Sequence, residues 1–129
     1  MIKSENTGTD VPKLMVKFRL DEKGTPIFIS QGSVKHFKIH ISIDNSPDDS
    51  YAVNYQLHPS YISPFREERN RAEAFGFNTT TYGDYIISAE LMGRKGNHIV
   101  STLVSEALDR NHSEKNQFIS DALKEIKEA

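Results

Sequence analysis

The chain has 129 residues and a net charge of −2, and 36% of its residues are hydrophobic while 26% are charged. These values are typical of one soluble globular domain that is long enough to bury a sizeable core. The weak net charge gives no electrostatic reason to expect a nucleic-acid or membrane-surface partner. The absence of cysteine excludes disulfides and thiolate zinc sites.

The first residues are expected to form a flexible tail. Residues 1–12 are rich in Ser, Asn, Thr, Gly and Asp and contain few apolar side chains, a composition that favours disorder. They lack the apolar segment of a signal peptide, and no later run approaches the roughly 20 apolar residues that span a bilayer. We therefore expect a cytoplasmic protein without a membrane partner.

Alternating apolar and polar residues predict strands through most of the chain. The pattern is clearest at 34–43, where four alternate apolar residues from Phe37 to Ile43 would share one face. Comparable segments, separated by turn residues, predict the remaining strands. These lie at 13–20, 26–29, 51–57, 75–80, 84–91 and 99–108, with a hairpin turn at 93–97. The helix propensity of residues 104–108 leaves the end of the last strand open.

The charged stretch 65–71 is expected to be a solvated loop, and the end of the chain is expected to be helical. Residues 111–113 offer N-cap side chains for a helix over 114–128. Its apolar stripe consists of Ile119, Ala122, Leu123 and Ile126. Many short strands followed by a helix predict an all-β fold, an antiparallel β-sandwich over 13–108 with a short C-terminal helix in 109–129.

Two loops carry more aromatic and polar side chains than turns require. Leu57-His58-Pro59-Ser60-Tyr61 ends one predicted strand, and Thr79-Thr80-Thr81-Tyr82-Gly83-Asp84-Tyr85 leads into another. If the two loops meet in space, they form a narrow aromatic slot with a few polar groups. Such a slot suits recognition of a flat polar group better than bond-breaking chemistry.

The same loops resemble the YEATS domain, and more closely its prokaryotic group. The resemblance rests on residues 53–61 and Pro64, then on Phe77 and residues 81–87, and it extends roughly over 11–108. It implies an immunoglobulin-like β-sandwich. Eukaryotic members bind acylated lysine, such as acetyl- or crotonyl-lysine on histone tails, whereas prokaryotic relatives resemble accessory or sensory domains.

Carried over residue by residue, the resemblance implies a ligand-binding site. Tyr61 and Tyr82 would be two aromatic walls, Tyr85 would close the back, and His58 and Ser60 would be polar contacts. The backbone N–H of Tyr82 would meet the acyl carbonyl. Thr81 departs from the pattern, because the family often has glycine there, and its β-branch would restrict the backbone and narrow the slot.

Each of these residues also has a structural interpretation. Tyr61 and Tyr82 would then pack the end of the sandwich, and Tyr85, which alternates with Ile87, would belong to the core. His58 and Ser60 would make local hydrogen bonds in a turn. Asp84 is expected to be a solvated turn residue.

We therefore expect a non-enzymatic binding module for acylated lysine, or a similar planar amide, on a protein or peptide partner, with no cofactor. The alternative is an interaction or scaffold domain of bacterial signalling or defence without an acyl-lysine pocket, which would use sheet edges or the C-terminal helix. Exposure of the apolar stripe of that helix would favour this alternative.

The sequence offers no catalytic or metal-binding constellation. No Ser–His–acid order or pair of carboxylates stands out. His36 and His40 would lie on one face of a strand about 13 Å apart, which is too far to share a metal ion.

Overall fold

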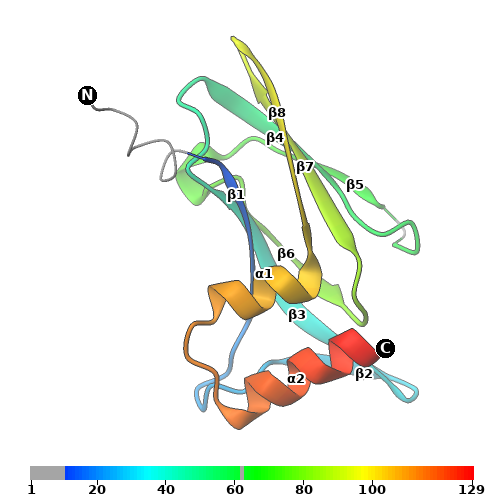
Figure 1. The fold of residues 1–129 in the computed structure, drawn as a ribbon. Helices are drawn as coiled ribbons and strands as arrows, with labels where there is room; N and C mark the ends of the chain where they lie inside the picture. Colours follow the sequence, from blue (N-terminus) through cyan, green and yellow to red (C-terminus); the bar gives the residue numbers. More distant parts are fainter. Residues whose placement is uncertain (1–10, 62) are drawn as a thin grey trace.

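Two antiparallel β-sheets face each other in the computed structural model, which describes residues 11–61 and 63–129. The tail predicted at 1–12 lies outside the described residues except for its last two positions. Figure 1 shows the two helices together at one end of the sheets. In the described part of the chain, no helix is long and apolar enough to cross a membrane.

The first sheet is built around β3 (Val34–Asp44). One edge of β3 pairs with β1 (Lys13–Phe18) and then β2 (Phe28–Gln31), and the opposite edge pairs with β6 (Phe77–Thr81). Ile39 illustrates this central position, since it is in register with a residue of β1 and with one of β6. Its side chain is fully buried, as the alternation in this segment predicts.

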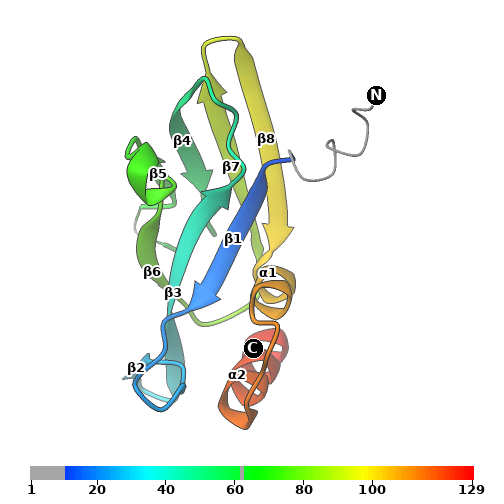
Figure 2. The same ribbon diagram turned by 90° about the vertical axis from the view of Figure 1, so that its left-hand side faces the viewer.

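The second sheet has the strand order β5-β4-β7-β8. Its members are β5 (Phe65–Glu68), β4 (Ser50–Gln56), β7 (Ile86–Gly93) and β8 (Gly96–Leu103). Figure 2 shows β1 and β8 on one side of the molecule and β5 and β6 on the other. The two sheets and the antiparallel pairing confirm the predicted β-sandwich.

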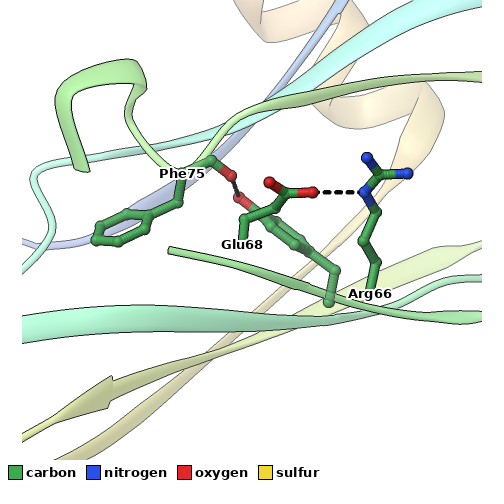
Figure 3. A network of polar contacts seen from close by, with 4 residues as sticks. Arg66, Glu68 and Phe75 are labelled. Carbon is green, nitrogen blue, oxygen red and sulfur yellow. Dashed lines mark hydrogen bonds and ion pairs between the residues drawn. The ribbon is translucent and has the colours of Figure 1, made fainter. Parts of the chain in front are cut away.

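The core lies between the sheets and continues beneath the helices. Its largest fully buried side chains include Tyr55 of β4, whose hydroxyl donates a hydrogen bond of 2.8 Å to the backbone oxygen of Phe75 (Figure 3). Burial, and then the nearby Glu68 carboxylate, raise the pKa of the Tyr55 hydroxyl. This phenol therefore stays neutral and bonded inside the sandwich.

The C-terminal region contains two helices in place of the single predicted one. α1 (Val104–Asn111) begins inside the segment 99–108 that was predicted as a strand, which ends instead at Leu103. The helical alternative for 104–108 is the correct one, because buried residues of α1 recur at helical spacing, as Val104, Ala107 and Leu108 show.

α2 (Gln117–Glu128) begins three residues later than predicted, after Asn116, whose side-chain oxygen accepts a hydrogen bond from the N–H of Ile119. Its entire apolar stripe is buried within the same core as the sheets. The stripe is therefore not a free surface for a partner, contrary to what the scaffold alternative would require of the helix.

β5 corrects the expectation that 65–71 is a loop. Arg66 pairs in register with Tyr55 of β4, and its Nε donates to Glu68 two residues further along the strand at 2.6 Å. A short 3-10 turn, η2 (Arg71–Glu73), follows. Pairing with β4 overrides the low strand propensity of this charged segment.

Candidate binding site

The two aromatic loops meet at one end of the sandwich. Because β4 and β7 are antiparallel neighbours, the end of β4 lies beside the start of β7, with Gln56 in register with Ser88. The loop after β4 and the loop before β7 are therefore adjacent. All six predicted site residues line one cleft of about 140 Å³ between them, namely His58, Ser60, Tyr61, Thr81, Tyr82 and Tyr85.

Tyr61 and Tyr85 form the inner part of the cleft. Both are half-buried and pack against the core, and their ring centroids lie 5.8 Å apart in an edge-on arrangement. The Tyr85 hydroxyl donates to the Tyr61 hydroxyl at 3.0 Å, and the Tyr61 hydroxyl donates to the backbone oxygen of Thr80. Burial is the main cause that raises the pKa of both phenols, so the pair is neutral.

Tyr82 lies at the outer part of the cleft and is 42% exposed. Its ring is tilted by 50° against the imidazole of His36, with centroids 5.2 Å apart, and its hydroxyl donates to Ser60 Oγ at 3.3 Å. The two predicted walls thus differ in kind: Tyr61 is held by two hydrogen bonds, and Tyr82 keeps an exposed face.

The hydrogen bonds of His58 define which of its ring nitrogens can bind a ligand. The N–H of Ser60 donates to His58 Nδ1 at 3.0 Å, so Nδ1 is an acceptor and the proton of the neutral ring lies on Nε2. Ser60 Oγ also lies 2.8 Å from Nδ1. The serine hydroxyl therefore donates to Nδ1 and accepts from Tyr82. The exposed His58 Nε2–H makes no hydrogen bond to the described residues and remains a donor for a ligand.

This serine–histidine contact is a local turn interaction two residues apart. A hydrolytic site also needs a group that orients the far nitrogen of the base. Asp84 lines the cleft, but its carboxylate accepts hydrogen bonds from the N–H and Oγ of Ser105, at 2.9 and 2.6 Å. Asp84 is thus half-buried and bonded to the first turn of α1, and the expectation of a solvated turn residue was wrong.

Thr81 and two residues that the sequence interpretation missed complete the cleft. The Thr81 side chain is 1% exposed, and its hydroxyl donates to the backbone oxygen of Gly83 at 2.8 Å, so it stabilises the loop from within. Gly83 and Ala129 also line the cleft. A Cβ at Gly83 would lie 3.6 Å from the Ala129 Cβ, and no local sequence pattern indicates this contact.

The fold and the cleft define a β-sandwich domain with a small aromatic-lined cleft at one end. The family model of the prokaryotic YEATS domain matches residues 37–101, half of the chain and including both loops. The chain belongs to this family.

A solved structure, "The Yaf9 YEATS domain Recognizing H3K122suc Peptide", is similar to this chain, with a TM-score of 0.52 and 12% sequence identity over 88% of this chain and 93% of that chain. At this identity the similarity concerns the fold alone. A search of curated proteins finds no match.

Proposed function

We propose that this chain is a non-enzymatic binding module that recognises an acylated lysine, or a similar planar amide, on a protein or peptide. The observation that carries the proposal is the convergence of all six predicted residues on one cleft. The proposal includes a cytoplasmic location and the use of the Tyr82 backbone N–H as a donor to the acyl carbonyl.

The size of the cleft favours the end of one side chain. Sites for drug-sized molecules have volumes of about 300–1,000 Å³, whereas this cleft has about 140 Å³. A flat amide head group would lie against the exposed ring of Tyr82 and above the edge-on pair of Tyr61 and Tyr85.

The polar groups favour a neutral amide over a charged ammonium. Burying an ammonium requires a carboxylate that turns toward it, whereas both oxygens of Asp84, which lines the cleft, accept hydrogen bonds from Ser105 that hold the carboxylate toward α1. The hydroxyls of Tyr61 and Ser60 are likewise engaged within the protein. The His58 Nε2–H, which has no partner among the described residues, can donate to a side-chain carbonyl. Acylated lysine has such a group and unmodified lysine lacks it.

A peptide titration followed by NMR tests the proposal. An acetyl-lysine peptide is expected to shift the resonances of Tyr61 and Tyr82 with a Kd of tens of micromolar or weaker, since so small a cleft offers few contacts against the cost of association. The same peptide with unmodified lysine is the control, and the acyl group should remain intact throughout. Unchanged tyrosine resonances at millimolar acetylated peptide would contradict the proposal.

The scaffold alternative keeps one observation in its favour. β8 lies at the edge of the second sheet, and its Ile99 is 72% exposed, so a partner strand could pair with this edge. A partner bound in this way would perturb the resonances of β8 and leave those of Tyr61 and Tyr82 unchanged.

A further inference from the structure

A groove of about 500 Å³ adjoins the cleft and shares Ser60, Tyr61 and Tyr82 with it. It is bordered by Thr79 and Thr80 of β6 on one side and by β5 on the other. A side chain that enters the cleft from a peptide requires space for the peptide's main chain and its neighbouring residues. The groove offers this space directly beside the cleft.

Apart from two tyrosines, the titratable side chains that line the described part of the groove are basic. None of the described residues that line it is acidic, and the basic side chains among them are Arg66 and His36. His36 lies next to Tyr82 at the shared wall, whereas Arg66 comes from β5. A peptide rich in lysine and arginine would find no carboxylate along this lining.

Arg66 is held in place by contacts that do not involve the two terminal nitrogens of its guanidinium group. Its Nε donates to the Glu68 carboxylate at 2.6 Å, and its guanidinium carbon lies 4.6 Å from the ring centroid of Phe77. The Nε atom makes the one hydrogen bond of the Arg66 side chain to the described residues, and the terminal nitrogens make none. Figure 3 shows its two terminal nitrogens turned away from Glu68. A fixed guanidinium with two free amino groups matches the two oxygens of a carboxylate.

We propose that Arg66 binds a carboxylate of the partner, so that the preferred ligand is an acylated lysine with an aspartate or glutamate a few residues away. This inference rests on the proposed function and deepens it by naming the partner as an acidic, not a basic, peptide segment. The Glu68 side chain, which is 21% exposed, positions the guanidinium and is itself turned to Arg66.

Three acetyl-lysine peptides that differ only in flanking residues test the inference by calorimetry. Peptides with acidic flanks are expected to bind about three- to tenfold more tightly than peptides with neutral flanks, and basic flanks are expected to weaken binding. The preference for acidic flanks should shrink as salt is added. The Arg66 side chain is 49% exposed, so salt can screen its attraction to the peptide carboxylate. The variant R66Q should bind the acidic and neutral peptides equally.

Arg69 provides a matched control on the same segment. It also pairs with a glutamate, Glu67, and lies over an aromatic ring, that of Tyr51, but it lines neither the cleft nor the groove. R69Q should therefore retain the preference for acidic flanks. If R66Q does not fold, R66K serves in its place, since it keeps the charge but loses the two-pronged geometry and should lose most of the preference.

The outcomes separate this inference from the function on which it rests. Equal affinity for acidic and neutral flanks, with Tyr82 still responding, would overturn the role of Arg66 and leave acyl-lysine binding intact. An equal loss of preference in R66Q and R69Q would assign the effect to overall charge and also overturn it. Failure of every acetylated peptide to bind would overturn the proposed function, and this inference with it.

Discussion

At the scale of single residues, Tyr61 and Tyr82 are expected to contribute in opposite ways to stability and binding. The Tyr61 hydroxyl connects Tyr85 to the Thr80 backbone, so Y61F removes the shared partner of two part-buried polar groups. This should lower the free energy of unfolding by about 1–3 kcal/mol and leave the ring in the cleft. Y82A removes an exposed ring and should change stability by only about 0.5 kcal/mol.

Binding should show the reverse order. Removal of the aromatic ring against which the amide is proposed to lie should cost about 1.4 kcal/mol or more, which corresponds to about tenfold in Kd. Y82A should therefore weaken acetyl-lysine binding at least tenfold, and Y61F much less. Urea unfolding and peptide titration of both variants measure the two effects. A Y61F variant as stable as the parent chain would show that the hydroxyl network does not support the cleft.

At the scale of elements, α1 is capped by a residue from a distant loop. Leu103, at the N-cap position, makes no side-chain hydrogen bond there, and Asp84 supplies the acceptor to the N–H of Ser105 instead. D84A should lower the free energy of unfolding by about 0.5–2 kcal/mol, as for loss of other helix N-caps, and loosen the loop that carries Tyr82. S105A keeps the backbone donor and loses only the hydroxyl contact, so its effect should be smaller. If D84A and the parent chain have the same free energy of unfolding, Asp84 does not act as the N-cap of α1.

These elements also show what local sequence can and cannot predict. The alternation in β3 and the stripe of α2 are visible because burial follows the period of each element. β5 was missed because its stabilising partner is remote, and the start of α1 was left open because the residue that caps it is remote. β5 depends on pairing with β4, and α1 depends on Asp84, which lies 21 residues before Ser105.

At the scale of the whole molecule, the meeting of the two loops could be predicted and the arrangement of their side chains could not. The two loop motifs identify residues that share one cleft, because antiparallel pairing of β4 and β7 places both loops at one end. The sequence does not show that Tyr61 is held by Tyr85 and Thr80 or that Asp84 is turned to Ser105. It also gives no indication of the groove, since this forms between β5, which was expected to be a loop, and β6.

His112, at the end of α1, is bonded to β1 and should make stability depend on pH. His112 Nε2 accepts a hydrogen bond of 2.9 Å from the N–H of Phe18 in β1, although 94 residues separate them. Burial, followed by the charges of Lys17 and Lys115, lowers the pKa of His112 below the ordinary histidine value of 6.5. The folded state therefore binds this proton less readily than the unfolded state.

It follows that the contribution of His112 to stability is complete above about pH 6.5 and is lost as the pH falls below that value toward the lowered pKa. H112Q retains an acceptor that can reach the Phe18 N–H but does not titrate. In urea unfolding between pH 7.5 and pH 5, the parent chain should lose more stability than H112Q, and the two curves should run parallel above neutral pH. Parallel curves over the whole range would mean that His112 accepts the proton equally in both states, and that its bond to β1 does not depend on the neutral ring.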